Sequence, residues 1–313
     1  DSTGALAEKA LVRAGDLYFR AGHYEDSRRC YEALLSRFGS SEKAPLALLR
    51  IAQCAYNSGG DEEALTLYSK VIERFPQSYA AREAERGMEQ ALYRLGQRDD
   101  GTEVLVRLVE QHGASPFAAD AQFEIAMRAY DAGEYGESAE QFRRVTSQFP
   151  GYSAADRAHY LMAESYRKAG MIRESRLACE QFVNFFPQSE FRPTVHFRLG
   201  SLRFEEGKYM QAAVDFTSVL DEGAPDEIMA AALYNLALSR RMLGETDAAL
   251  ENLQKYRKTY PSGEGRAAEI AYQIGDIHEE LGRPAEAVEE FERALAASPE
   301  GSMAVEMRYR TGS

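Results

Sequence analysis

The stretch Arg128-Ala129-Tyr130-Asp131-Ala132-Gly133 decides the fold, because its glycine recurs at a fixed distance along the chain. Steps of 37 residues, with a single step of 38 before the last, connect eight glycines: Gly22, Gly59, Gly96, Gly133, Gly170, Gly207, Gly244 and Gly282. Self-similarity at a period of this length indicates an array of similar supersecondary units, each packed on its neighbours.

Each unit contains two amphipathic helical patterns separated by the glycine. When this glycine is numbered fifteen, positions eight and twenty carry small residues in nearly every unit, and position twenty-four carries a large apolar one. Glu89 is the exception at position eight, and Cys179 fills position twenty-four in its unit. Such positions recur at spacings of three, four and seven, as the buried stripes of two helices require.

Glycine separates the two helical patterns of each unit, and proline often follows the second one. The glycine is placed where the first helix ends, a position that commonly requires positive φ. A proline ends the second helix in five units: Pro76, Pro150, Pro187, Pro261 and Pro299. The sequence therefore predicts an all-α solenoid without strands, a single array over residues 1–313. The predicted repeats are 8–44, 45–81, 82–118, 119–155, 156–192, 193–229, 230–266 and 268–304. Residues 305–313 are predicted either to begin a ninth repeat or to form a capping helix.

The combination of small, glycine, aromatic and proline positions resembles the tetratricopeptide repeat. The segments Phe197-Arg-Leu-Gly200 and Gly207-Lys-Tyr209-Met-Gln-Ala212 fit it closely, whereas the third unit, around Glu89 and Gly101, fits it least. The resemblance implies a right-handed superhelix of eight helix pairs. It also implies a non-catalytic scaffold or adaptor that binds a partner peptide or helix in a concave groove, and no enzyme.

The junctions between units carry a second resemblance. Phe75-Pro-Gln-Ser78, Phe149-Pro-Gly-Tyr-Ser153 and Phe186-Pro-Gln-Ser189 look like junctions in bacterial cell-envelope members of that family. Those members are the lipoprotein of the outer-membrane β-barrel assembly machine and the coordinator protein of the Tol-Pal system. This resemblance implies a periplasmic or envelope location, with room for a lipid anchor upstream. The alternative is a regulatory or assembly segment of a larger, cytoplasmic multidomain protein. The first and last residues read as those of a processed or truncated chain.

Composition excludes several classes of function. The net charge of −13 argues against a nucleic-acid partner, since phosphate binding needs a basic face. No apolar run approaches the roughly 20 residues that span a bilayer. The three cysteines show no metal-ligand spacing and are expected to be core thiols. A zinc site at His159 and His196 lacks supporting ligands, and His278 reads as solvated helix surface. We therefore predict no metal, no cofactor and no catalytic residue.

Position twelve supplies the candidate binding residues. In the resembling family this position faces the concave groove, where aromatic rings offer a strip for a peptide or helix. The alternative is burial of the same rings against the next repeat. The predicted partner-binding residues are Phe19, Tyr56, Tyr93, Tyr130, Arg167, Phe204 and Arg241.

Two weaker patterns lie in the later repeats. Position five is aromatic in Phe123, Tyr160, Phe197, Tyr234, Tyr272 and Tyr309, and packing against the preceding repeat is favoured over a specialised groove. Residues 262–300 carry ten acidic and three basic side chains, a net charge of −7. A solvated helix face is the usual reason for such a run, and the alternative is an acidic end that steers a basic partner.

Overall fold

The computed structural model describes residues 2–261, 266–300 and 302–311, and within these ranges its regular structure is entirely α-helical. The chain divides into two compact units, residues 1–152 and residues 153–313. The prediction of an all-α fold of helix pairs is confirmed. A single array over the whole chain and the right hand of its superhelix stay predictions.

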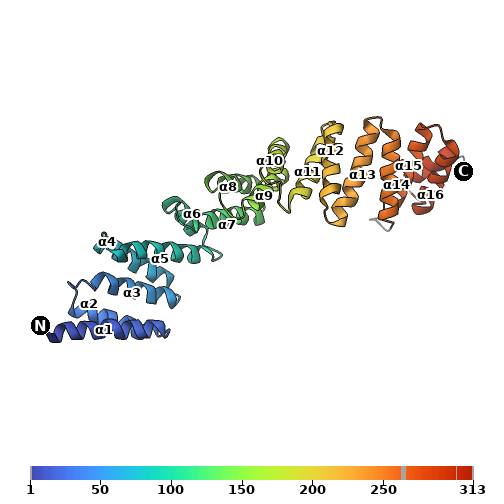
Figure 1. The fold of residues 1–313 in the computed structure, drawn as a ribbon. Coiled ribbons are helices and arrows are strands. Elements are labelled where there is room, and N and C mark those ends of the chain that lie inside the picture. The colour runs from blue at the N-terminus through green and yellow to red at the C-terminus, as the bar shows by residue number, and fades with distance from the viewer. Residues whose placement is uncertain (1, 262–265, 301, 312–313) are drawn as a thin grey trace. The chain divides into compact units, whose positions relative to one another are not determined.

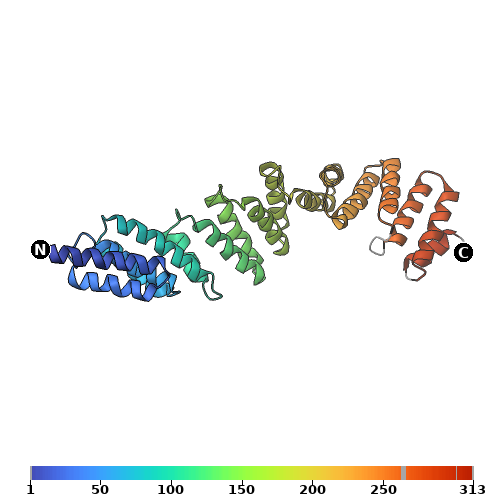
Figure 2. The same ribbon diagram turned by 60° about the horizontal axis from the view of Figure 1, so that its bottom comes forward.

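Unit 1 is built from four helix pairs. Its helices are α1 (Ser2–Arg20), α2 (Tyr24–Arg37), α3 (Ala44–Asn57), α4 (Asp61–Arg74), α5 (Tyr79–Gly96), α6 (Thr102–Gln111), α7 (Ala118–Asp131) and α8 (Tyr135–Gln148). Consecutive helices contact each other, and both ribbon views show them side by side (Figures 1 and 2). We call the first helix of each pair the A helix and the second the B helix.

Unit 2 continues with four pairs and one further helix. Its helices are α9 (Ala155–Lys168), α10 (Ile172–Phe185), α11 (Arg192–Glu205), α12 (Tyr209–Glu222), α13 (Asp226–Met242), α14 (Thr246–Thr259), α15 (Ala267–Glu280), α16 (Pro284–Ala297) and α17 (Ser302–Thr311). The B helices of five repeats end two residues before a proline, as predicted: α4, α8, α10, α14 and α16.

The repeating glycine reverses the chain between the A and B helices. Gly133 has φ of 79°, and the amide of the next residue, Glu134, donates to the carbonyl of Ala129 over 2.9 Å. A residue with a Cβ is strained at such a φ, whereas glycine is not. Positive φ is found at seven of the eight glycines: Gly22, Gly59, Gly133, Gly170, Gly207, Gly244 and Gly282.

Gly96 departs from the expected turn. It is the last residue of α5, which is 18 residues long, and it is not among the glycines with positive φ. A Cβ on Gly96 would lie 2.2 Å from Cδ2 of Leu105 on α6. The B helix of the third repeat, α6, is shorter than the other B helices, and Gly96 is required by close helix packing. The prediction that Gly96 ends its helix in a left-handed turn is wrong.

Small residues at position eight lie against large ones at position twenty-four. A Cβ added to Gly200 on α11 would lie 2.9 Å from the ring of Phe216 on α12, and one added to Gly15 would lie 2.7 Å from the ring of Tyr31. Both rings are fully buried. Each A helix thus accepts a bulky side chain of its B helix because it carries no bulk of its own at the contact.

Every A helix begins before its predicted repeat boundary, by one residue in five repeats and by three or more residues in α1, α5, α13 and α17. The helix α13 begins at Asp226, four residues before 230, because Gly223 at φ 81° and Pro225 end the preceding turn. Pro225 has φ of −52°, which suits the residue that precedes a helix. The helix α17 begins before residue 305 and buries Ala304 and Met307 in one cluster with Phe291.

Two side-chain predictions are corrected by burial. His278 was expected on a solvated face but is only 9% exposed, because α15 turns it into the interior between neighbouring helices. Cys54 and Cys179 are buried as expected, whereas Cys30 is partly exposed on α2. None of the helices in the described part of the chain has the length and hydropathy needed to cross a lipid bilayer.

Candidate functional site

The candidate site lies on the A helices of unit 1. Phe19 on α1 and Tyr56 on α3 are both partly buried, and together they line a cavity of about 420 Å³. The α3 and α5 helices supply the polar part of its wall: Arg50, Gln53, Asn57, Glu83, Arg86 and Gln90. We call this cavity and the one that adjoins it the A-helix groove.

The adjoining cavity extends the groove along α5. Its volume is about 450 Å³, and it shares Arg86 and Gln90 with the first cavity. The remaining wall comes from further α5 side chains and from the segment before α7, which contributes Pro116 and Phe117. The two cavities therefore form one run of polar and aromatic surface across at least three repeats.

The groove is chemically suited to a polypeptide. Gln53, Asn57 and Gln90 carry amide groups, each with donors and an acceptor, which match the N–H and C=O groups of a peptide backbone. The ring of Phe19 has the guanidinium of Arg50 5.0 Å from its centroid. Apolar faces beside amide groups can hold side chains and backbone of one segment at the same time.

Tyr56 is held by a cation from the next repeat. The guanidinium carbon of Arg94 lies 3.7 Å from the centroid of the Tyr56 ring. Arg94 also hydrogen-bonds to Asp61, whose side chain is 4% exposed. The Oδ2 atom of Asp61 lies 3.2 Å from Nη2 of Arg98. The hydrogen bond to Asp61 raises the pKa of Arg94, so the cation over the ring stays charged. Tyr56 is therefore oriented before any partner arrives.

Tyr93 and Tyr130 are partly buried but take other contacts. Tyr93 stacks on Phe117 at a centroid distance of 5.2 Å, and burial raises the pKa of its phenol. Tyr130 meets Tyr135 edge to face at 5.5 Å, across the turn at Gly133. Phe117 connects Tyr93 to the wall of the second cavity, whereas Tyr130 lines neither cavity.

The predicted residues of unit 2 take part in contacts inside the array. Arg167 pairs with Glu164 at 3.1 Å. Phe204 meets Tyr209 edge to face at 5.2 Å, in the same geometry as the pair at Gly133. Arg241 on α13 hydrogen-bonds to Gln273 on α15 over 2.7 Å, and so it ties two consecutive A helices together. Of the predicted set, Phe19 and Tyr56 line one cavity together.

The position-five aromatic residues pack forward along the array. The hydroxyl of Tyr234 donates to Glu269 of the following repeat over 2.7 Å, and that of Tyr272 donates to Glu306 over 2.9 Å. Their rings contact B-helix aromatics of their own repeat. These contacts lie within the residues' own repeats and toward the following repeat, whereas the favoured prediction was packing against the preceding repeat. Tyr309 is 88% exposed and does not share this packing.

The two histidines are separate features of the interior. His159 lies among Phe182, Phe185 and Phe186, and burial lowers its pKa to about 4. His196 faces Asp215, with its Nδ1 atom 3.2 Å from the carboxylate. Within the described ranges, no group of three or more potential ligand side chains is placed to hold a metal ion.

Sequence reasoning missed the polar wall of the groove. Arg50, Gln53, Asn57 and Gln90 occupy positions six, nine and thirteen of their repeats, which precede or follow position twelve by a few residues. Positions six, nine and thirteen are spaced by three and four residues, and position nine lies three residues before position twelve, so these residues fall on one side of the A helix. That periodicity is the signal that would have found them.

Comparisons with known proteins agree with this architecture. The sequence model described as tetratricopeptide repeat matches residues 12–79 and 90–153, and the one described as tetratricopeptide repeat-like domain matches residues 153–310. A comparison with curated proteins gave no match.

Similarity to solved structures occurs at low sequence identity. The crystal structure of YrrB, a tetratricopeptide repeat protein with an unusual peptide-binding site, is 16% identical, with a TM-score of 0.53 over 66% of this chain and 99% of YrrB. The MamA protein is 20% identical, with a TM-score of 0.49 over 58% of this chain and 93% of MamA. At 16% identity the likeness to YrrB concerns the fold alone.

Proposed function

Because the chain belongs to the tetratricopeptide repeat family, we propose that it is a non-catalytic interaction scaffold whose A-helix groove binds a peptide or helix of a partner protein. YrrB, which shares the fold, has a peptide-binding site. Neither a cofactor nor a nucleic acid is part of this proposal, in keeping with the acidic net charge of −13.

The observation that carries the proposal is the convergence of several helices on one cavity. Phe19, Tyr56 and the amides of Gln53 and Gln90 come from α1, α3 and α5, so no single helix forms the site. The cation over Tyr56 fixes the ring without filling the cavity. A preorganised aromatic anchor beside amide groups lowers the ordering cost of binding an extended segment.

Selection from a random peptide library against the full chain tests the proposal. Fluorescence anisotropy with the selected peptides should show binding at least tenfold weaker for Tyr56→Ala and for Gln53→Ala, because each change removes one wall of the cavity. Thr66→Ala is the matched control, since Thr66 is exposed on α4 outside the groove. Selected peptides whose affinity is the same for all four proteins would place the binding surface elsewhere.

We further propose a bacterial cell-envelope location. The support is the sequence of the junctions, in which an aromatic-proline pair is followed by a serine, as at Ser78 and Ser189. Ser78 caps α5 by accepting a hydrogen bond from the amide of Ala81 over 3.1 Å. Osmotic-shock fractionation of the source cells with an antibody to the chain tests this location. Recovery with cytoplasmic marker proteins would instead favour the regulatory segment of a larger cytoplasmic protein.

A further inference from the structure

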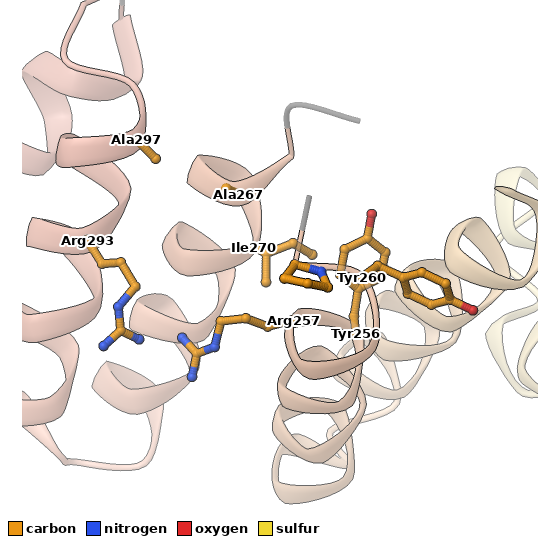
Figure 3. Close-up of a pocket in the computed structure, with 8 residues that line it drawn as sticks. Tyr256, Arg257, Tyr260, Ala267, Ile270, Arg293 and Ala297 are labelled. Carbon is orange, nitrogen blue, oxygen red and sulfur yellow. The ribbon is translucent and has the colours of Figure 1, made fainter. Parts of the chain in front are cut away.

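A second pocket lies in unit 2, between the end of α14, the start of α15 and α16. Its volume is about 210 Å³, and its apolar wall includes Tyr256, Tyr260, Pro261 and Ile270. Figure 3 shows Tyr256, Tyr260 and Ile270 on one side of the pocket and the guanidinium groups of Arg257 and Arg293 next to each other on the other. We call it the Arg257 pocket.

Arg257 departs from the apolar pattern that other repeats show at its position. Position twenty-eight is apolar in six of the eight repeats: Leu35, Ile72, Val109, Val183, Leu220 and Leu295. Thr146 takes this position in the fourth repeat, and Arg257 is its only charged residue. Departures from a local rule are expected where a site has a function. Packing alone would be served by leucine.

The two arginines are held in place by one buried carboxylate. Nη1 of Arg257 lies 2.8 and 2.7 Å from the two oxygens of Glu290, and Nη1 of Arg293 lies 2.7 Å from one of them. Glu290 is 7% exposed, and among the described residues the charged side chains that line the pocket are Arg257 and Arg293. Two cations against one anion leave an excess positive charge at the wall.

Both guanidinium groups retain donors for a ligand. Their bonds to Glu290 use Nη1 only, and in the described ranges no hydrogen bond is made by Nε or Nη2 of Arg257 or Arg293. A carboxylate accepts from such a fork in charge-assisted hydrogen bonds. The apolar side of the pocket is large enough for one side chain, since an apolar cavity of about 150 Å³ holds benzene.

We propose that the Arg257 pocket binds an internal acidic segment of a partner protein, which places one large apolar side chain in the cavity and an adjacent Asp or Glu carboxylate on Arg257 and Arg293. Charge complementarity carries the choice of occupant: the excess charge at the wall is positive, within a chain whose net charge is −13. This site is separate from the A-helix groove and does not depend on it.

The probe for the test is the peptide acetyl-Glu-Leu-Glu-amide, added to the full chain with 13C-labelled isoleucine δ1 methyl groups. The Ile270 methyl resonance, assigned with Ile270→Val, should shift in a saturable manner, whereas that of Ile51 in unit 1 should not. Acetyl-Gln-Leu-Gln-amide and acetyl-Glu-Ala-Glu-amide should each bind about tenfold more weakly, because each lacks one of the two recognised groups.

Three outcomes with peptides would overturn the proposal. They are the absence of a saturable shift at Ile270, equal binding of the glutamine peptide, and equal or tighter binding of acetyl-Gln-Leu with a free terminal carboxylate. The last result would assign the pocket to a chain terminus, and not to an internal acidic residue.

Two protein variants separate binding from folding. Ala297→Phe should fill the mouth of the pocket and abolish the shift, because Ala297 is exposed and the same position carries Phe185 in the fifth repeat. Gln148→Phe is the matched control at that position in unit 1. Arg257→Leu should weaken binding about tenfold, and it should also lower the thermal midpoint because the buried Glu290 loses one of its two cationic partners. Unchanged binding by Ala297→Phe or Arg257→Leu would contradict the proposal.

Discussion

The hydroxyl of Ser138 at position twenty donates a hydrogen bond to the carbonyl oxygen of Ala126 at position eight, over 3.1 Å. Ser27 makes the same bond to Gly15, and Ser175 makes it to Ala163, both over 2.9 Å. All three serines are fully buried. Position twenty is therefore small for packing and, in these three repeats, also joins the B helix to the A helix of its own pair.

Ser138→Ala should destabilise the chain by about 0.5–1.5 kcal/mol, the net value of a buried hydrogen bond. The repeat tolerates alanine sterically, since Ala64 and Ala212 occupy the same position in other repeats. The change in the free energy of unfolding is measured by urea denaturation, followed through spectroscopic signals from unit 1. Ser147→Ala is the control, because its hydroxyl is exposed and bonds only within α8. If the two variants change the free energy of unfolding equally, the buried hydrogen bond of Ser138 does not stabilise the chain.

Ala212→Leu should destabilise the chain by about 1–3 kcal/mol, since extra methylene groups at a fully buried helix contact force neighbouring side chains apart. The neighbouring Gln211 is exposed on the same helix, so Gln211→Leu should leave the free energy of unfolding nearly unchanged. Chemical denaturation of both variants beside the parent compares the two. A neutral result for Ala212→Leu would contradict the assigned register of α12.

Gly133→Ala and Gly136→Ala should shift the thermal midpoint in opposite directions. Neither added Cβ would meet another atom within 4 Å, so packing is not involved. Gly133 has φ of 79°, where alanine is strained by about 1–2 kcal/mol. Gly136 lies in α8 without positive φ, and there alanine should stabilise by about 0.5–1 kcal/mol. Calorimetry of the two variants measures the shifts in thermal midpoint, and shifts of the same sign would contradict the turn geometry at Gly133.

Stability should decrease as the pH falls from about 6.5 toward 4, because His159 is buried among aromatic rings. Burial lowers its pKa from 6.5 to about 4, so in this window the unfolded chain binds a proton that the native chain excludes. Linkage makes the loss about 3 kcal/mol once the pH is below the native pKa. Above about pH 6.5 this group has no effect.

His159→Leu should reduce that pH dependence, since Leu48 and Leu233 occupy the same position in the second and seventh repeats. Urea unfolding at pH 5 and at pH 7.5 measures the difference for the parent and the variant. His23→Gln is the control, because the His23 ring is exposed. If His159→Leu leaves the difference in the free energy of unfolding between pH 5 and pH 7.5 unchanged, titratable groups other than His159 dominate the pH dependence.

The sequence by itself determined the helix pairs, their turns and the small-to-large contacts inside each pair. These features depend on residues that are close in the chain, such as Gly207, whose backbone conformation excludes most side chains, and Gly200, which leaves room for Phe216. Amphipathic periodicity decides which face of a helix is buried, and it does so within a few turns. The all-α class and the positions of seven turns were therefore predictable.

Only the tertiary structure decided which side chains of neighbouring repeats meet. Arg94 reaches Tyr56 and Asp61 of the preceding repeat, and Arg257 reaches Glu290 of the following one, in both cases across more than 30 residues. Periodicity places such residues on a face but does not select their partners. The choice depends on the sizes and charges of side chains on two or three helices at once. For the same reason, the repeat period does not give the close contact between Gly96 and Leu105 in the third repeat.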